Sequence, residues 1–140
     1  MSPISVLLVD DNPIFLRITS RFLKKHDDVD LVGTAGGGVE ALSKAQKLRP
    51  QVILLDLAMP DLPGLEVIPR LREVVPEMRI IALTMLDTEE YRKAALAAGA
   101  DEFVPKVDLN TDLLPAIRRV VGVGRPRGSV SDKSSQDQKP

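Results

Sequence analysis

The organisation of this chain is first visible in residues 6–13, which read VLLVDDNP. A run of four apolar residues is followed directly by Asp10 and Asp11, and then by Asn12-Pro13. Asparagine is a favoured N-cap and proline is favoured in the first helical turn, so this stretch predicts a buried strand that ends in acidic residues and leads into a helix. Three later apolar runs also lead into polar residues: residues 52–55 into Asp56, residues 80–83 into Thr84, and residues 103–104 toward Lys106.

Strands and helices are predicted to alternate along the rest of the chain. The predicted strands are residues 6–9, 29–34, 52–56, 79–84 and 101–104. Five helices are predicted between and after these strands. The first begins at Asn12-Pro13 and has Ile14, Phe15, Ile18 and Phe22 at helical spacing, and the second ends at Arg49-Pro50. The third has Pro69 in or near its first turns and ends at Pro76, the fourth has a capping-box-like start at Asp87 and Glu90, and the fifth has apolar residues within 113–121. This alternation predicts an α/β fold with right-handed crossovers and a parallel sheet covered by helices on both faces.

The size and composition favour a single domain. We expect it to span residues 1–121 of the 140, and we expect residues 122–140 to be a flexible tail or a truncated linker, too short to form a DNA-binding domain. The net charge of −1 gives no general attraction to nucleic acid or to an anionic membrane, and residues 1–3 lack the basic character of a signal peptide. The chain has no cysteine, which excludes disulfides and thiol chemistry and is compatible with the cytoplasm, where we expect the protein to be.

The polar residues at the strand ends are expected to form one site. Parallel strands in open α/β folds line a single crevice with their carboxyl ends, which would bring Asp10, Asp11 and Asp56 together with Thr84 and Lys106. Two carboxylates about 5 Å apart repel each other by roughly 3 kcal/mol at an effective dielectric constant of about 20, so such a site needs a cation. Oxygen ligands without cysteine or a nearby histidine favour Mg²⁺ or Mn²⁺ over zinc.

A phosphate group is the expected second ligand of this site, because protein-bound Mg²⁺ commonly binds substrate phosphates. The ammonium group of Lys106 and the hydroxyl of Thr84 are suited to hold phosphoryl oxygens. A carboxylate is already ionised at neutral pH and can attack phosphorus without a general base. Asp56 stands alone at the end of a central strand and is the expected nucleophile, whereas Asp10 and Asp11 are the expected metal ligands.

Each of these residues also has an ordinary structural interpretation when it is taken alone. The acidic pair could complement a helix dipole, Asp56 could be a solvated turn residue, and threonine is common in strands. A lone lysine is usually solvated and a lone phenylalanine is usually buried in the core. The three glycines at 36–38 match neither common phosphate-binding motif, so they predict a plain turn. The functional interpretation therefore depends on the residues occurring together.

Four motifs together resemble the receiver domain of bacterial two-component response regulators. They are VDDNP at 9–13, LLDLAMPDLPG at 54–64, ALTM at 82–85 and GADEFVPK at 99–106, and the resemblance covers about residues 4–121. It implies a flavodoxin-like (βα)₅ fold with strand order 2-1-3-4-5. The ALTM motif and Asp87 further resemble receivers that precede a LuxR-type helix-turn-helix domain.

The resemblance also implies a role for each residue of the site. Asp56 would accept a phosphoryl group from a phosphohistidine on a sensor histidine kinase. Asp10, Asp11 and Asp56, together with the backbone carbonyl of Ala58, would form the Mg²⁺ site. Thr84 and Lys106 would hold the phosphoryl group. On this basis we expect a signalling domain and not an enzyme, with at most slow self-dephosphorylation.

The resemblance implies a conformational switch as well. Thr84 would move toward the phosphoryl group, and Phe103 would then turn inward. That change would alter the surface of the fourth helix, fifth strand and fifth helix, through which an output domain or protein partner would be bound and through which phosphorylation-dependent dimerisation would act. Two residues differ from the family's usual pattern, since Phe103 replaces the commoner tyrosine and Val107 replaces the proline that usually follows the lysine.

Three other functions compete with this interpretation. An aspartate-nucleophile phosphohydrolase would use a similar set of residues, but it usually has a second acid two residues after the nucleophile, where this chain has Ala58. A flavin-binding electron carrier is disfavoured by the small number of aromatic residues and by the acidic pocket. A receiver-like interaction module that is never phosphorylated is disfavoured by the complete set of Asp, Thr and Lys.

Overall fold

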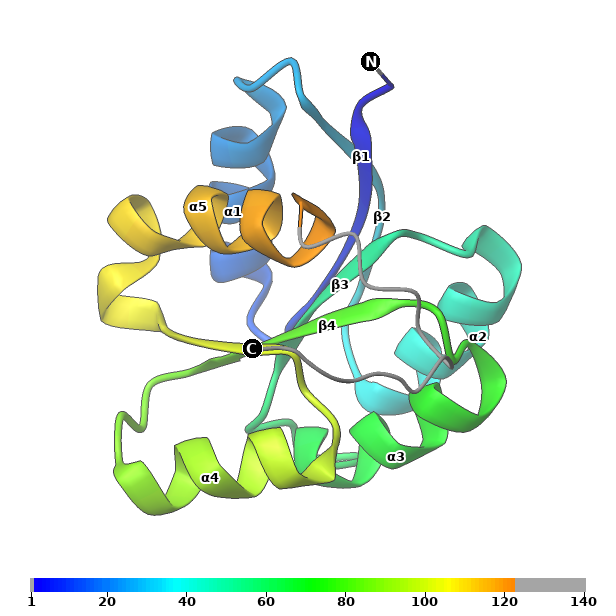
Figure 1. Cartoon of the computed structure of the whole chain (residues 1–140), viewed down its shortest axis with the longest axis vertical. Helices are drawn as coiled ribbons and strands as arrows, with labels where there is room; N and C mark the ends of the chain where they lie inside the picture. Colours follow the sequence, from blue (N-terminus) through cyan, green and yellow to red (C-terminus); the bar gives the residue numbers. More distant parts are fainter. Residues whose placement is uncertain (1, 123–140) are drawn as a thin grey trace, which may run out of the picture.

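The computed structural model describes residues 2–122, in which five strands alternate with helices (Figure 1). In chain order the elements are β1 (Ile4–Val9), α1 (Pro13–Lys24), β2 (Val29–Ala35), α2 (Gly38–Leu48), β3 (Val52–Asp56), α3 (Gly64–Val74), β4 (Arg79–Thr84), α4 (Glu89–Ala98), β5 (Glu102–Pro105), the short 3₁₀ helix η1 (Lys106–Asp108) and α5 (Leu109–Gly122). Apart from Gly122, which ends α5, the expected tail lies outside the described residues.

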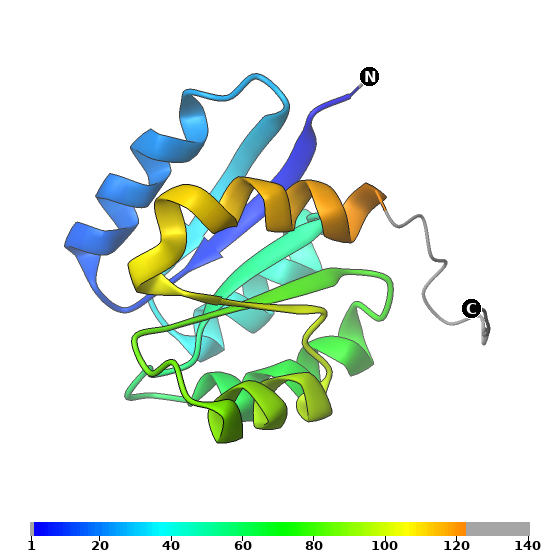
Figure 2. The same cartoon turned by 60° about the vertical axis from the view of Figure 1, so that its left-hand side comes forward.

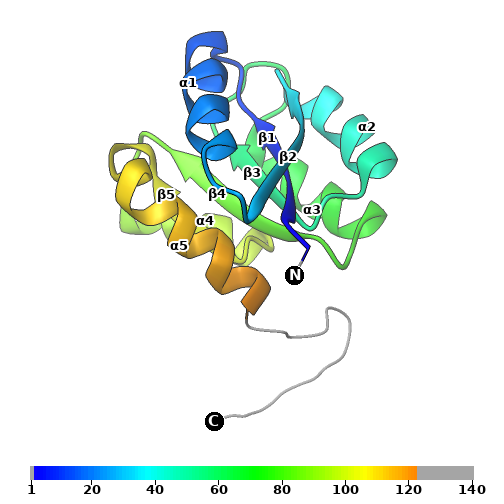
Figure 3. The ribbon, with the colours of Figure 1, turned by 90° about the horizontal axis from the view of Figure 1, so that it is seen from above.

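The five strands form one parallel sheet in the order β2-β1-β3-β4-β5. Helices α1 and α5 pack on one face, and α2, α3 and α4 pack on the other (Figures 2 and 3). The predicted α/β class, the strand order and the coverage of both faces are therefore confirmed. This topology matters for the site because the carboxyl ends of all five strands lie along one edge of the sheet.

The sheet is buried on both faces, as its apolar runs predicted. Alternate residues of β1 and β3 point to opposite sides: Leu7 and Ile53 join the core under α2, α3 and α4, whereas Leu8 and Leu54 join the core under α1 and α5. All four side chains are fully buried. Such burial holds the strand ends in fixed positions and so fixes the polar residues that follow them.

Two helix starts test the capping predictions. Asn12 caps α1 as predicted, and its side-chain oxygen accepts the N–H groups of Ile14 and Phe15 at 2.9 and 3.3 Å. The predicted capping box at the start of α4 is wrong. Thr88, not Asp87, is the N-cap, because its Oγ1 accepts the N–H of Tyr91 at 3.2 Å.

One other detail of the helices differs from the sequence pattern. Ile14 and Ile18 are 57% and 58% exposed, so the side of α1 that faces the sheet is centred instead on the buried Thr19 and Leu23. Pro69 is the sixth residue of α3 and lies in its second turn, as predicted, because α3 begins at Gly64. Within residues 2–122, none of the helices has the length and apolar character that a bilayer crossing requires.

Candidate functional site

The predicted site residues meet at the carboxyl edge of the sheet. Asp10 follows β1, Asp56 ends β3, Thr84 ends β4 and Lys106 follows β5. Asp10, Asp56 and Thr84 are almost fully buried, with exposed fractions of 0%, 3% and 1%. Asp11 is exposed beside them. Buried carboxylates are costly unless other groups compensate their charge, so their surroundings indicate what the site can bind.

Three carboxylates of this edge lie close enough to share one cation. Asp10, Asp11 and Asp56 each offer an oxygen, and these oxygens all lie within 4.8 Å of one another. Mg²⁺ and Mn²⁺ favour such oxygen ligands, and the described residues place no cysteine or histidine among them. The donor set therefore fits the metal that the sequence predicts.

Lys106 reaches into the same group of carboxylates. Its Nζ lies 2.5 Å from Asp10 Oδ2 and 3.2 Å from Asp56 Oδ1, and its side chain is only 11% exposed. The ammonium group also lies 4.2 Å from the centre of the Phe15 ring, a cation–π contact. One positive charge thus compensates part of the negative charge of two buried carboxylates.

The environment of Asp56 disfavours its ionised form on balance. Burial raises the pKa of Asp56 above its ordinary value of 3.8, and the nearby charge of Asp10 raises it further. Lys106 and a hydrogen bond from the backbone N–H of Ala58 oppose this rise in pKa. A further positive charge would relieve the remaining cost, which is consistent with a cation site.

Thr84 and Phe103 lie on neighbouring strands. The hydroxyl of Thr84 accepts the N–H of Leu86 at 2.9 Å and so holds the first residues after β4. Phe103 is 8% exposed and belongs to the core cluster under α4, so its ring points inward in this structure. Ala58, whose carbonyl was predicted as a metal ligand, lies in the exposed loop after β3. No peptide bond of the described residues is cis, including the one between Lys106 and Val107.

The sequence analysis missed the role of Asp61. This residue lies in the loop after β3, and its two carboxylate oxygens accept the N–H groups of Gly38 and Val39 at 3.1 and 3.2 Å. A Cβ at Gly37 would lie 2.8 Å from the carboxylate of Asp61, so that carboxylate would have to shift from its present position. The absence of a side chain at Gly37 thus allows the loop after β3 to cap α2 through Asp61. No local sequence pattern predicts the contact between Asp61 and the start of α2, because the two lie more than 20 residues apart in the chain.

The sequence analysis also missed Tyr91 in α4. Burial raises the pKa of Tyr91 above 10.0, and the negative charge of Asp56 raises it further. The ring packs against the core cluster that contains Phe103. The charge of the acidic site therefore acts on Tyr91, although α4 supplies none of the residues of that site.

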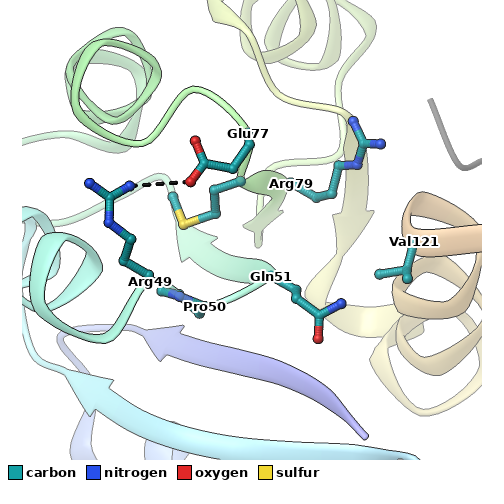
Figure 4. A pocket seen from close by; sticks show the side chains of 7 residues that line it. Arg49, Pro50, Gln51, Glu77, Arg79 and Val121 are labelled. Atoms are coloured by element: carbon teal, nitrogen blue, oxygen red, sulfur yellow. Dashed lines mark hydrogen bonds and ion pairs between the residues drawn. The ribbon is translucent and has the colours of Figure 1, made fainter. Parts of the chain in front are cut away.

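A cavity of about 260 Å³ lies at the opposite edge of the sheet (Figure 4). It is lined by the residues at the amino ends of β3 and β4, including Gln51 and Arg79. Arg49 and Glu77 form an ion pair of 3.2 Å at its rim. The cavity is separate from the acidic site, which remains the candidate for phosphoryl chemistry.

Comparisons with known proteins identify the family of this chain. A family model described as the response regulator receiver domain matches residues 6–118. The chain is 36% identical over 119 residues to response regulator protein VraR of Staphylococcus saprophyticus; the match covers 84% of this chain and 56% of that protein, so the chain spans little more than half of the relative. The solved response regulator domain of Thermotoga maritima CheB is 30% identical, with a TM-score of 0.81 and coverage of 86% of this chain and 97% of that one. A LuxR-family two-component response regulator from Aurantimonas sp. SI85-9A1 is 27% identical, with a TM-score of 0.83 and coverage of 89% of both chains.

Proposed function

Because the chain belongs to the response regulator receiver domain family of two-component systems, we propose that Asp56 accepts a phosphoryl group from the phosphohistidine of a sensor histidine kinase in a Mg²⁺-dependent reaction. Receiver domains of this family are signalling domains that are phosphorylated on an aspartate. One observation carries the choice of Asp56. It is the buried carboxylate at the end of the central strand, within 4.8 Å of ligand oxygens of Asp10 and Asp11 and paired with Lys106.

Mg²⁺ or Mn²⁺ would be held by Asp10, Asp11 and Asp56 together with the backbone carbonyl of Ala58. The metal would supply positive charge and orientation for the phosphoryl oxygens. The three carboxylates support this proposal because one oxygen of each lies within 4.8 Å of the others, so that a single cation could contact all three.

In the proposed transfer, a carboxylate oxygen of Asp56 attacks the phosphorus atom of the donor. A P–O bond forms while the P–N bond of the phosphohistidine breaks, and the electron pair of the P–N bond stays with the imidazole. Asp56 needs no general base, because a carboxylate carries no proton to remove when it attacks, and Lys106 and the N–H of Ala58 partly oppose the rise in its pKa. Lys106 would then turn from Asp10 to a phosphoryl oxygen, and the hydroxyl of Thr84 would donate to another.

The phosphodonor is proposed to dock on the rim of the acidic site. Three exposed apolar side chains lie on the elements that surround it: Ile14 and Ile18 in the first turns of α1, and Val107, which is 74% exposed and directly follows Lys106. Ile14 and Ile18 are four residues apart and therefore share one side of the helix. Exposed apolar side chains that gather on one surface are typical of protein interaction sites.

The output is proposed to depend on the surface formed by α4, β5 and α5. The hydroxyl of Thr84 holds the N–H of Leu86, so movement of Thr84 toward a phosphoryl group would shift the start of α4. Phe103 points inward beneath α4 and would stabilise the shifted arrangement. We propose that this surface binds an output domain or a protein partner, and that it supports phosphorylation-dependent dimerisation.

The similarity to LuxR-family regulators supports transcription regulation in the cytoplasm as the biological role. A DNA-binding output domain would then contact nucleic acid, and the receiver itself would bind neither nucleic acid nor membrane. The role of the whole protein rests on relatives of which the chain covers 56% of the length.

The acceptor assignment is tested by intact-mass measurement with an acyl-phosphate donor and Mg²⁺. The expected result is the gain of one phosphoryl group, which Asp56→Asn abolishes and which needs the divalent cation. Asp61→Asn is the matched control, because Asp61 lies in the loop that follows Asp56 but outside the acidic cluster. Labelling that persists in Asp56→Asn contradicts the assignment. Prolonged turnover of a phosphoester substrate would favour a phosphohydrolase instead.

A further inference from the structure

The chain between Thr84 and Tyr91, which includes the first two residues of α4, is exposed along its whole length. All six residues from 85 to 90 are exposed, among them Met85 at 66% and Leu86 at 58%. Thr84, which precedes the segment, is buried, and Tyr91, which follows it, is partly buried against the core cluster that contains Phe103. Tyr91 is therefore the first residue after Thr84 that is not exposed.

The two ends of α4 are anchored very differently. At the C-terminal end, the side chain of Arg72 donates two hydrogen bonds to the carbonyl of Gly99 at 3.0 and 2.7 Å and forms an ion pair of 2.6 Å with Asp101. At the N-terminal end, Tyr91 is the only large side chain on the inner side of the helix. Ala95 is the one buried residue of α4. The helix is thus fixed at its C-terminal end and attached through a single ring at the other.

The same ring lies within reach of the charge in the acidic site. The pKa of Tyr91 is raised first by burial and then by the negative charge of Asp56. The N–H of Tyr91 is held by Thr88, the N-cap of α4, so the position of the ring and the position of the helix start are linked. A change at Asp56 and a change at Thr84 would consequently act on the same end of α4.

We propose that Tyr91 is a positioning residue that anchors the N-terminal end of α4 to the domain, so that a change at the acceptor site, passed on through Thr84 and Leu86, displaces this end of the helix about its fixed C-terminal end. The inference rests on the proposed phosphorylation of Asp56. It adds a specific anchor to the predicted pair of Thr84 and Phe103.

The chain offers a direct probe of this anchor, because it contains one tyrosine and no tryptophan. Its intrinsic fluorescence therefore comes from Tyr91 alone. We expect the emission of the chain to change when it is loaded with beryllofluoride and Mg²⁺, or with an acyl-phosphate donor while intact mass follows phosphorylation. Asp56→Asn should abolish both the change in emission and the gain in mass.

Full phosphorylation without any change in Tyr91 emission would overturn the inference and leave the acceptor assignment intact. Absence of any gain in mass would instead overturn the proposed function, and the inference with it. The two failures are therefore distinguishable within one experiment.

Amide hydrogen exchange of residues 85–98 then separates positioning from a general loss of stability. In Tyr91→Ala we expect exchange of this segment to be several-fold faster before loading and to change no further after loading, although the protein is still phosphorylated. Tyr91→Phe keeps the ring and should behave like the unmodified chain. Leu96→Ala is the control, because Leu96 is an exposed residue of the same helix. Faster exchange throughout the domain, or a full loading response in Tyr91→Ala, would contradict the positioning role.

Discussion

The ammonium group of Lys106 lies 2.5 Å from Oδ2 of Asp10, a residue 96 positions earlier in the chain. The same nitrogen lies 3.2 Å from Asp56. The ends of β1, β3 and β5 are thus joined by one charge, which compensates the two buried carboxylates. A divalent cation among the same carboxylates would compete with this role of Lys106, so the lysine and the metal are electrostatically coupled.

Lys106→Met should therefore have opposite effects on metal binding and on phosphorylation. Removing the positive charge leaves the carboxylates more negative, and we expect Mg²⁺ to bind about tenfold more tightly, equivalent to about 1.4 kcal/mol. Phosphorylation by an acyl-phosphate donor should become much slower, because one group that holds the phosphoryl oxygens is lost. Calorimetry of Mg²⁺ binding and intact-mass time courses measure the two effects. Weaker Mg²⁺ binding in the variant would contradict the coupling.

The burial of Asp56 should make its charge costly for folding. Burial raises the folded pKa of Asp56 above 3.8, so the ionised side chain destabilises the fold at neutral pH, and this cost disappears as the pH falls below 3.8. Asp56→Asn should therefore unfold at a higher urea concentration than the unmodified chain at neutral pH without divalent cation, with a gain on the order of 1 kcal/mol. The gain should shrink near pH 4. Equal or lower stability of the variant at neutral pH would argue against this electrostatic cost.

Substitution by valine should change the stability of the domain in opposite directions at two threonines, one within α1 and one at the N-cap of α4. Thr19 is fully buried in α1, and its hydroxyl has no hydrogen-bond partner among the described residues. Thr19→Val should raise the free energy of unfolding by about 1 kcal/mol, because it removes an unsatisfied polar group at nearly the same size. Thr88→Val removes the N-cap of α4 and should lower it by about 1 kcal/mol. Urea unfolding of both variants tests the pair, and a loss of stability in Thr19→Val would show that its hydroxyl has a favourable role.

The sequence predicted the acidic site because its residues follow strands. Asp10, Asp56 and Thr84 each come directly after or at the end of an apolar run, and parallel strands bring their carboxyl ends to one edge of the sheet. The placement of these side chains therefore needed only a correct reading of the strands. The order of the strands in the sheet does not follow from the strand pattern alone. That prediction came from the resemblance to a family.

Contacts between distant elements could not be predicted in the same way. Asp61 caps α2 from another loop, and Tyr91 packs from α4 against the core cluster that contains Phe103. Neither contact leaves a periodic pattern in the sequence. The exposure of Ile14 and Ile18 was hidden for a different reason. Helical spacing shows that two residues share a side of a helix, but it does not show whether that side faces the sheet or a partner.

The cap formed by Asp61 should stabilise the domain at neutral pH and less so in acid. Hydrogen bonds from the backbone of Gly38 and Val39 lower the pKa of Asp61 below 3.8. Its contribution is therefore present above pH 3.8 and is lost as the pH falls through the lowered pKa. Asp61→Ala should unfold at a lower urea concentration than the unmodified chain at neutral pH, and Asp61→Asn, which keeps one acceptor oxygen, should fall between them. A difference between Asp61→Ala and the unmodified chain that does not shrink in acid would exclude the charge of Asp61 as its source.

The exposed side of α1 should matter for the protein phosphodonor and not for a small one. Ile18 is 58% exposed in α1, the helix that follows Asp10 and Asp11, and it is not one of the three residues of the acidic cluster. Ile18→Glu should slow phosphoryl transfer from a phosphorylated histidine kinase at least about tenfold, because it places a charge in an apolar contact, a penalty of about 1.4 kcal/mol or more. The rate with an acyl-phosphate donor should remain unchanged. Leu48→Glu is the matched control, since Leu48 is 42% exposed at the C-terminal end of α2, at the opposite edge of the sheet. Equal slowing with both donors would place the effect of Ile18 in the acceptor chemistry, and equal slowing in the control would remove the case for docking on α1.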